Sequence, residues 1–364
     1  MKKIQLSLPG RSYDILIGRG LTYDCGAAIR GLRIGRDAVV VTNERLFALY
    51  GKAIRASLRR AGLSVHFELV PDSERAKSAK VVFGLINDIS TYDKDRTLFL
   101  VAFGGGVVGD VAGFAAAVYK RGIPYVQMPT TLLAQVDSAI GGKTAIDTTV
   151  AKNLVGAFYQ PRIVLSDTGM LDSLAPRQMR TGMAEVIKYG VIKDARLFEY
   201  LENNLRNIYA HRPEALELIV SRSSAIKARV VEADEFDRKG ARVILNYGHT
   251  IGHAIETASG YSGRYSHGEA ISIGMVVASD IAVRLGLLKA PDGARIEALI
   301  KKAGLPTALA GLRLRDLYEA HRHDKKFIHG KNRFVLPRGI GIAGTVEDIP
   351  EAVIKGSLAG RLSR

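Results

Sequence analysis

The sequence contains a single cysteine, Cys25, among its 364 residues. One cysteine excludes a disulfide framework within the chain and any zinc site built from several thiolates, and it is typical of a reducing, cytoplasmic setting. Tryptophan is absent, and we find neither an internal repeat nor a low-complexity segment. Because hydrophobic residues make up 47% and charged residues 24% of the chain, we expect an ordinary globular protein.

Long uninterrupted apolar runs are lacking as well. The most apolar region, TLFLVAFGGGVVGDVAGFAAAVY, is broken by glycines and by Asp110, so it does not predict a membrane-spanning helix. The first residues, MKKIQLSLPG, alternate polar and apolar side chains. This alternation predicts a strand and not the apolar centre of a signal peptide. We therefore expect a cytoplasmic protein without a membrane partner.

The charge is strongly of one sign, with a formal net charge of +16. Such a charge raises the possibility of nucleic-acid binding. However, the lysines and arginines are scattered along the chain, without a basic tail or the aromatic–basic interleaving that stacks bases. A basic surface also draws small phosphates and carboxylates into a cleft. We expect a small anionic substrate and no nucleic acid, and keep a nucleic-acid-binding protein as the alternative from another class.

The first half of the chain alternates strand and helix patterns. Short runs rich in branched and aromatic residues predict strands at 37–42, 63–70, 97–103, 125–129 and 162–167. Helical patterns at 44–62 and 73–90 lie between the early strands, which predicts a Rossmann-like, doubly wound parallel sheet. From about Pro176, apolar residues recur at helical spacing. We expect an α/β domain over 1–175 and a mostly α-helical domain over 176–364.

A glycine-rich turn, FGGGVVGD, follows the predicted strand at 97–103. Gly104, Gly106 and Gly109 have the spacing that lets a backbone approach a pyrophosphate at a helix N-terminus. Alone this pattern is weak, because a tight strand-to-helix turn produces it too and no acid follows about 20 residues later to hold a ribose. The charge of Asp110 would repel a diphosphate, so this side chain is better suited to a ribose hydroxyl or to the nicotinamide side.

The stretch at 129–161 concentrates polar residues between apolar ones. Lys143 and Lys152 are suited to bind phosphate or carboxylate as point charges. With Asp137 and Asn153 nearby in the sequence, and with glycines before Lys143, the stretch predicts a site for a polyanion. The GGK tripeptide alone would be read as a loop with a solvated lysine.

Two further stretches offer metal ligands. In GMAEVIKYG, Glu185 and Lys188 share one face of a mostly apolar helix, so the glutamate needs either a lysine or a metal as its partner. His249, His253 and His267 follow, and with Glu185 they provide ligands suited to Zn²⁺, Co²⁺ or Fe²⁺. The spacing alone leaves open whether His249 and His253 bind one metal together or have different roles.

These stretches together resemble the 3-dehydroquinate synthase family of sugar phosphate cyclases, from the N-terminal strands to about residue 343. The motifs that carry the resemblance, in chain order, are GGGVVGDVAGFAAA, RGIPYVQMPTTLLAQVDSAIGGKTAID, KNLVGAFYQP, GMAEVIKYGVI, LNYGHTIGHAIE, SHGEAISIGM and HDKKFIHGKNRFVLPRGIG. The resemblance implies a homodimeric lyase of the shikimate pathway that uses NAD and Zn²⁺ or Co²⁺. It would convert 3-deoxy-D-arabino-heptulosonate 7-phosphate into 3-dehydroquinate and phosphate by transient oxidation, phosphate elimination, re-reduction and aldol closure.

The resemblance also implies roles for individual residues. The metal ligands would be Glu185, His249 and His267. The NAD contacts would be Asp72, Glu74, Lys77, Gly104, Gly105, Gly106, Val107, Gly109, Asp110, Thr130 and Thr131, with Lys143 and Lys152 at the boundary between cofactor and substrate. Catalytic positions would be Lys188, His253, Asp137, Lys143 and Asp237. Substrate-binding positions would be Arg121, Lys152, Asn153, Lys227, Arg242, Asn246, Lys325 and Lys326, with Arg121 reaching the phosphate from the neighbouring subunit.

The sequence departs from the family pattern at a few positions. The nucleotide stretch reads DSERAKS, with Ser73 for glycine and Ala76 for an aromatic residue, and Ala151 replaces the glycine before KNL. One extra residue precedes Arg242, in a region that usually carries a glutamate as proton acceptor; the nearest carboxylate there is Asp237. The alternatives are another sugar phosphate cyclase and a metal-dependent polyol dehydrogenase of the same architecture.

Overall fold

The structure, a computed structural model, describes residues 1–95, 97–260, 262–322 and 332–362. The predicted substrate residues Lys325 and Lys326 lie outside the described residues. The chain divides into two compact units. The first consists of Met1–Leu174 and Leu216–Phe236, and the second of Ala175–Ala215 and Asp237–Arg364.

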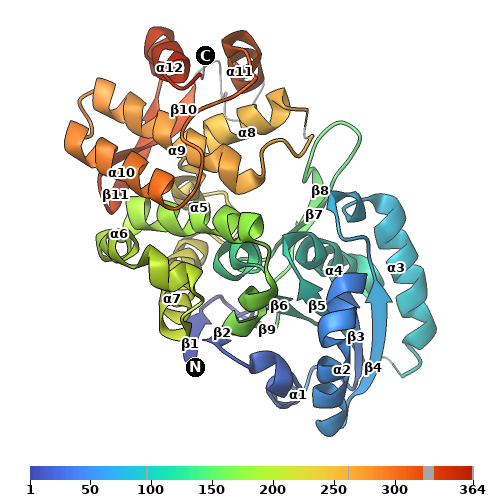
Figure 1. The fold of residues 1–364 in the computed structure, drawn as a ribbon. Helices are drawn as coiled ribbons and strands as arrows, with labels where there is room; N and C mark the ends of the chain where they lie inside the picture. Colours follow the sequence, from blue (N-terminus) through green and yellow to red (C-terminus); the bar gives the residue numbers. More distant parts are fainter. Residues whose placement is uncertain (96, 261, 323–331, 363–364) are drawn as a thin grey trace. The chain divides into compact units, whose positions relative to one another are not determined.

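A seven-stranded sheet forms the centre of the first unit (Figure 1). Its strands in spatial order are β1 (Lys2–Leu6), β2 (Tyr13–Gly18), β9 (Ile163–Asp167), β6 (Tyr125–Pro129), β5 (Leu98–Gly104), β3 (Asp37–Thr42) and β4 (Ser64–Leu69). Neighbouring strands run parallel except for β1 and β2. The predicted parallel sheet is confirmed, and each of the five predicted strands matches an observed one to within a residue or so at either end.

Both faces of this sheet are buried, and side chains alternate between them. Val39 and Val41 of β3 join a core with α3 (Ala79–Tyr92) and α4 (Gly106–Val118). Ala38 and Val40 join the opposite core with α1 (Leu21–Gly31) and α2 (Glu44–Arg60). Burial on both faces explains why the strands read as continuous apolar runs in the sequence.

The order of the strands reverses beside β5. From β3 the chain adds β4 on the outer side, returns to form β5, and then continues to β6 on the other side. In open parallel sheets, ligands bind at the carboxyl ends of the strands where the order reverses. The glycine-rich turn that follows β5, and Thr130 and Thr131 after β6, lie at this edge of the sheet.

Besides β2 and α1, a hairpin and a π-helix of the first unit were not predicted. A hairpin of β7 (Lys143–Ile146) and β8 (Val155–Phe158) packs on α4, and a short π-helix, η3 (Ala134–Ser138), precedes it. The strands of the hairpin are four residues each, too short to give a clear alternating pattern in the sequence.

The helix α7 (Pro213–Ala233) contributes most of Leu216–Phe236, which belongs to the first unit. A division at 175/176 leaves this segment in the second domain. In the structure, Ser224 Oγ donates a hydrogen bond to the carbonyl of Gln135 at 3.2 Å, and Glu235 accepts from Arg11. These contacts explain why the segment packs with the first unit, and helical periodicity alone does not specify a packing partner.

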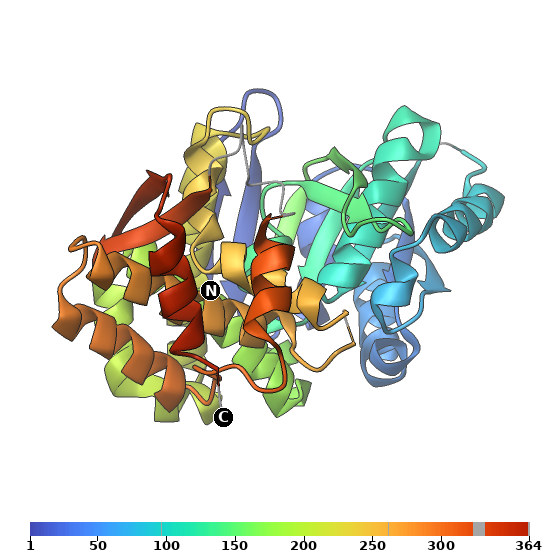
Figure 2. The same ribbon diagram turned by 90° about the horizontal axis from the view of Figure 1, so that it is seen from above.

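The second unit is mostly helical, as expected. Its elements are α5 (Pro176–Lys193), α6 (Ala195–Tyr209), η5 (Ala241–Asn246), α8 (His249–Ala258), α9 (His267–Arg284), α10 (Ala290–Lys302), α11 (Leu314–Arg322), β10 (Arg333–Gly339), β11 (Ile342–Glu347) and α12 (Glu351–Ala359). Figure 2 shows the β10–β11 hairpin and α12, both of which pack against α9. No helix in the described part of the chain combines the length and the apolarity that a membrane crossing requires.

Glycines let three helices of this unit approach closely. A methyl group added at Gly268, the second residue of α9, would overlap the backbone of Thr181 in α5. One added at Gly274 would overlap the carbonyl oxygen of Gly248, which caps α8 with φ of 81°. The backbones of α5 and α8 are therefore each in contact with α9, and these contacts fix where α8 and α9 begin.

We predict that Gly274→Ala destabilises the protein, because its methyl group has to push the start of α8 away from α9. Overpacking of this kind costs about 1–3 kcal/mol, which a fall in the thermal unfolding midpoint measures. Gly84→Ala is the matched control, since Gly84 lies in α3 with open space around its Cα. That variant is expected to be neutral or slightly more stable. Equal midpoints for the two variants would contradict the close contact.

Candidate active site

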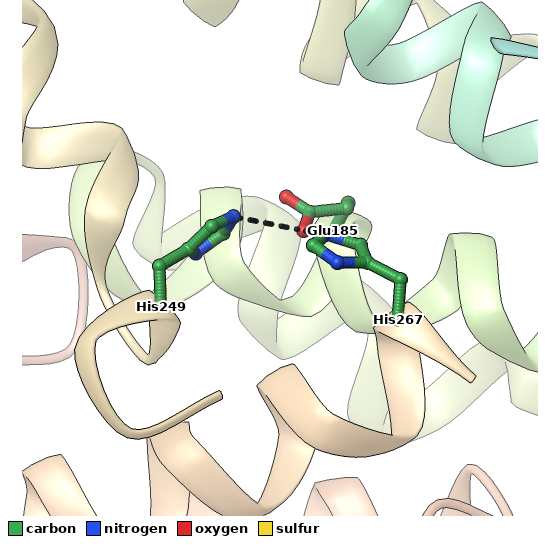
Figure 3. Close-up of side chains that lie close together, drawn as sticks. All are labelled: Glu185, His249 and His267. Atoms are coloured by element: carbon green, nitrogen blue, oxygen red, sulfur yellow. Dashed lines mark ion pairs between the residues drawn. The ribbon is translucent and has the colours of Figure 1, made fainter. Parts of the chain in front are cut away.

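Three side chains of the second unit converge on one point (Figure 3). Glu185 comes from α5, His249 is the first residue of α8, and His267 is the first residue of α9. The Nε2 atoms of His249 and His267 lie 3.6 Å and 3.5 Å from the same carboxylate oxygen, Oε1 of Glu185. One ligand atom from each residue lies within 4.8 Å of the others.

Local sequence sets where α9 begins and so where His267 lies. Ser266 and Glu269 form a capping box, in which Ser266 Oγ accepts from the Glu269 N–H and Glu269 accepts from the Ser266 N–H. Arg177 holds the Glu269 carboxylate from α5 at 2.6 Å. The capping box thus fixes the first turn of α9, from which the imidazole of His267 extends toward Glu185.

Glu185 is fully buried, with 0% of its side chain exposed. Its second oxygen, Oε2, contacts the ammonium group of Lys188 one helical turn later, and Lys188 is itself 1% exposed. A buried carboxylate is strongly destabilising without a partner. The sequence left open whether that partner is a lysine or a metal, and in the structure Lys188 faces one oxygen while the two imidazoles face the other.

The outer nitrogens of both imidazoles also have acceptors. His249 Nδ1 lies 3.2 Å from the carbonyl oxygen of Tyr247, and His267 Nδ1 lies 3.3 Å from Oε1 of Glu256. Burial by itself would lower the pKa of His267, but its hydrogen bonds to Glu185 and Glu256 outweigh burial and raise the pKa to about 10. Metal binding at this imidazole therefore has to displace a proton.

His253 lies one turn after His249 on α8, yet it does not belong to the converging group. Its ring centroid is 6.5 Å from that of His267, whereas the centroids of His249 and His267 are 5.4 Å apart. Among the described residues, the ligand atoms that converge are those of Glu185, His249 and His267. One carboxylate oxygen and two imidazole nitrogens fit Zn²⁺ or Co²⁺, and three protein ligands leave positions open for a substrate.

The segment before α8 carries three more of the predicted residues. Arg242, which is buried, and Asn246 lie in η5, a few residues before His249. Asp237 lies on an exposed turn with a positive φ of 56°. Asp237, the acid predicted as proton acceptor, therefore belongs to the second unit, and its side chain is exposed.

In the first unit, the glycine-rich turn has the close packing that a dinucleotide site requires. β5 ends at Gly104, Gly105 caps α4, and the helix begins at Gly106, so Val107 lies in its first turn. A methyl group at Gly109 would lie 3.0 Å from the side-chain oxygen of Gln127 on β6. The third glycine thus allows close packing of helix on strand, which is its role in dinucleotide-binding turns.

The other predicted NAD residues surround this turn. The N–H of Thr130 donates to the carbonyl of Gly104 at 3.0 Å, and Thr131 Oγ1 accepts from the N–H of Ala134. Asp72 accepts a hydrogen bond from Asn43 after β3 at 2.7 Å. Residues after β3, β4, β5 and β6 therefore line the carboxyl edge of the sheet.

Lys77 links two groups of predicted residues within the first unit. It is 5% exposed, its Nζ donates to Oδ2 of Asp110 at 2.6 Å, and it also contacts the side-chain oxygen of Asn153. Burial raises the pKa of Asp110 to about 6, although Lys77 acts in the opposite direction. Lys77 thus connects the first turns of α4, where we expect NAD, with the loop that carries the predicted substrate residue Asn153. Lys152 is more exposed than Lys77, and its Nζ lies 3.4 Å from Oε1 of Glu74.

The remaining predicted residues lie on the π-helix, on α7 and at turns. Asp137 of η3 accepts a hydrogen bond from Lys227 of α7 at 2.5 Å, and π-helices frequently occur at functional sites. Lys143 begins β7, with its Nζ 6.0 Å from the ring centroid of Phe158. Arg121 is exposed, and its φ of 65° follows the positive φ of Lys120.

Two groups beside the converging ligands Glu185, His249 and His267 were not predicted as part of the site. They are the carbonyl of Tyr247 and the carboxylate of Glu256. A signal for Glu256 was present in the sequence, because residues seven apart on a helix lie on one face, and Glu256 follows His249 by seven positions.

Comparison with known families covers most of the chain. The model of the 3-dehydroquinate synthase N-terminal domain matches residues 68–181. The model of the C-terminal domain of the same enzyme matches residues 182–327. The two matches are contiguous and include the glycine-rich turn and all three converging ligands.

Individual proteins, one 3-dehydroquinate synthase and two related cyclases, are also similar to this chain over nearly its whole length. The chain is 46% identical over 360 residues to a 3-dehydroquinate synthase of Pelotomaculum thermopropionicum, covering 99% of this chain and 94% of the relative. A 2-epi-5-epi-valiolone synthase from Streptomyces hygroscopicus with NAD⁺ and Zn²⁺ bound superposes with a TM-score of 0.88 at 28% identity, over 97% of this chain and 98% of that one. A 2-deoxy-scyllo-inosose synthase with carbaglucose-6-phosphate, NAD⁺ and Co²⁺ superposes with a TM-score of 0.89 at 28% identity. This match covers 99% of this chain and 100% of that one. The chain therefore belongs to the 3-dehydroquinate synthase family.

Proposed function

We propose that this protein converts 3-deoxy-D-arabino-heptulosonate 7-phosphate into 3-dehydroquinate and phosphate. The observation that carries the proposal is the convergence of one carboxylate oxygen and two imidazole nitrogens in a chain that is 46% identical to a 3-dehydroquinate synthase over 360 residues. Identity to the cyclases that make other rings is lower, at 28%. The stretches IGGKTAID and KNLVGAF are intact, which also favours the dehydroquinate reaction.

NAD⁺ and a divalent cation, Zn²⁺ or Co²⁺, are the cofactors that we propose. Both kinds are bound in related cyclases, and the donor atoms of Glu185, His249 and His267 suit such a cation. When bound, such a cation would supply Lewis acidity to a substrate hydroxyl, and NAD⁺ would supply reversible hydride transfer. The carboxyl edge of the sheet, with its glycine-rich turn, would hold the dinucleotide.

The protein's own side chains would bind and orient a substrate that carries a phosphate and a carboxylate. Lys152, Lys227 and Arg242 provide positive charge for these groups. Asp137 holds the ammonium group of Lys227 at 2.5 Å, which fixes the direction of that cation. Because fixed charges need no reorganisation during reaction, they stabilise a leaving phosphate efficiently.

Lys188 and His253 would act next to the metal ligands. Lys188 contacts one oxygen of Glu185, and we propose that its ammonium group also faces the substrate phosphate. His253, on the same helix as His249, would donate hydrogen bonds or move protons at the substrate. The role of Asp237 as proton acceptor stays a prediction, as do the individual contacts of Asn153, Asn246, Lys325 and Lys326.

We also propose a homodimer in which Arg121 acts on the substrate of the neighbouring subunit. Arg121 follows Lys120 in the left-handed region of backbone conformation. Such conformations are costly for residues other than glycine, and they cluster at functional sites. The cytoplasmic location, based on the single cysteine, and the lack of a nucleic-acid partner stay predictions.

The first test compares products. With the heptulosonate phosphate, NAD⁺ and Zn²⁺ or Co²⁺, we expect one phosphate and one dehydroquinate per substrate consumed, without net NADH. Absorbance at the NADH band, a phosphate assay and chromatography of the product measure the three quantities. NADH that accumulates in proportion to substrate would indicate a polyol dehydrogenase instead, and turnover of a different sugar phosphate would indicate another cyclase.

A second test removes two side chains at the cluster. Lys188→Ala and His267→Ala should each lower the rate of phosphate release by on the order of 100-fold or more, because each removes a group that fixes charge at the reacting centre. Lys193→Ala is the matched control, since Lys193 is exposed at the end of the same helix, α5. Wild-type turnover in either of the first two variants would disprove the site assignment.

A third test addresses Arg121 across the dimer. Arg121→Ala and His267→Ala should each be nearly inactive alone. After the two variants are unfolded together and refolded, activity should return to about a quarter of wild type, because half of the dimers are mixed and each of these has one intact site. If Arg121 acts within its own subunit, the mixture stays inactive.

A further inference from the structure

Glu256 is an acidic residue beside the converging ligands Glu185, His249 and His267. It lies on α8, seven residues after His249 and on the same helix face. Its side chain is 17% exposed, and Oε1 lies 3.3 Å from Nδ1 of His267 on α9. One helix therefore carries a metal ligand and also reaches the second imidazole ligand on the neighbouring helix.

We propose that Glu256 is a positioning residue of the metal centre, which holds the His267 imidazole with its Nε2 toward Glu185. The inference rests on the proposed metal site, since Glu256 would act through His267 and not on the substrate. A hydrogen bond from Nδ1–H to the Glu256 carboxylate places the lone pair on Nε2, where the metal binds. It also fixes the rotation of the ring about the Cβ–Cγ bond.

The two imidazoles differ in where the acceptor for their Nδ1 atom comes from. Nε2 of both faces Oε1 of Glu185, at 3.6 Å for His249 and 3.5 Å for His267. His249 has a main-chain acceptor, the carbonyl of Tyr247, only two residues away. His267 begins its helix, and the polar groups nearest to it in sequence, Ser266 and Glu269, are bonded to each other in the capping box. The acceptor for His267 thus comes from α8.

Close helix packing makes the reach from α8 to α9 possible. Gly252 of α8 lies against Ile271 of α9, and Gly248 lies against Gly274. A carboxylate acceptor also binds an imidazole N–H more strongly than a neutral carbonyl does. Residues in such outer positions typically change metal affinity by about 10–100-fold when they are replaced.

The test is metal affinity of the full-length, metal-free protein, measured for Zn²⁺ by competition with a chromogenic chelator. Glu256→Ala should bind Zn²⁺ about 10–100-fold more weakly than wild type. Its Co²⁺ complex should show an altered visible absorption spectrum, because the His267 ligand is no longer fixed. Glu256→Gln keeps the length and one acceptor oxygen, so its affinity should lie between those of Glu256→Ala and wild type.

Two controls separate positioning from general effects. Glu199→Ala removes an exposed carboxylate on α6 and should leave affinity unchanged, whereas His267→Ala should weaken binding more than any Glu256 variant. Wild-type Zn²⁺ affinity and an unaltered Co²⁺ spectrum in Glu256→Ala would overturn the proposal. If that variant does not fold, Glu256→Gln decides: weakened affinity in a folded protein supports the role, and wild-type affinity with an unaltered spectrum overturns it.

These measurements need no substrate, so they are independent of the proposed reaction. A protein that binds Zn²⁺ in a Glu256-dependent way but forms no dehydroquinate would contradict the proposed function and leave the role of Glu256 intact. An active enzyme whose metal affinity does not depend on Glu256 would support the proposed function and contradict the role of Glu256.

Discussion

The buried carboxylate of Glu185 is the constraint on which the second unit depends. A charged group with 0% exposure is strongly destabilising unless opposite charges or hydrogen-bond donors surround it. Lys188 satisfies one oxygen, and the imidazoles of His249 and His267 face the other. Because the two imidazoles belong to the first residues of α8 and α9, the starts of these helices must lie close together. The glycine contacts that bring α5, α8 and α9 together therefore also shape the candidate metal site.

The first unit depends on a different constraint, the burial of both faces of its sheet. Helices on each side leave only the strand ends accessible for ligands, and the reversal of strand order beside β5 brings several of these ends together. Lys77 adds a polar link at this edge. By binding both Asp110 and the Asn153 side chain, it couples the start of α4 to the loop before β8.

The sequence predicted features that follow from local periodicity. Strands β3, β5 and β6 were recognisable because they are short runs of mostly apolar, branched and aromatic residues. The C-terminal helices were recognisable because their apolar residues recur at helical spacing. The short β7–β8 hairpin was not recognisable. The packing of α7 in the first unit could not be predicted either, since its periodicity shows that one face is buried but not what covers it.

At the candidate metal site, the four-residue spacing of His249 and His253 predicted that both lie on one helix face. The family resemblance implied a different role for each. Geometry adds the physical reason. His249 begins α8 and points Nε2 at Glu185, whereas His253 lies a turn further along, outside the group of atoms within 4.8 Å. The spacing of Glu256 from His249 indicated that both lie on one face of α8, but not what Glu256 contacts there. Its partner, His267, lies on another helix, and the spacing within one helix does not predict a contact with a second.

A crystal structure of the protein with Zn²⁺ or Co²⁺ bound would test most directly whether Glu185, His249 and His267 hold one metal ion. We expect an ion within about 2.0–2.2 Å of one Glu185 oxygen and of Nε2 of both His249 and His267. His253 should lie outside the coordination sphere, and Glu256 should be bonded to the outer nitrogen of His267. An ion bound by His249 and His253 together, or one that leaves Glu185 without a metal contact, would rule out this set of ligands.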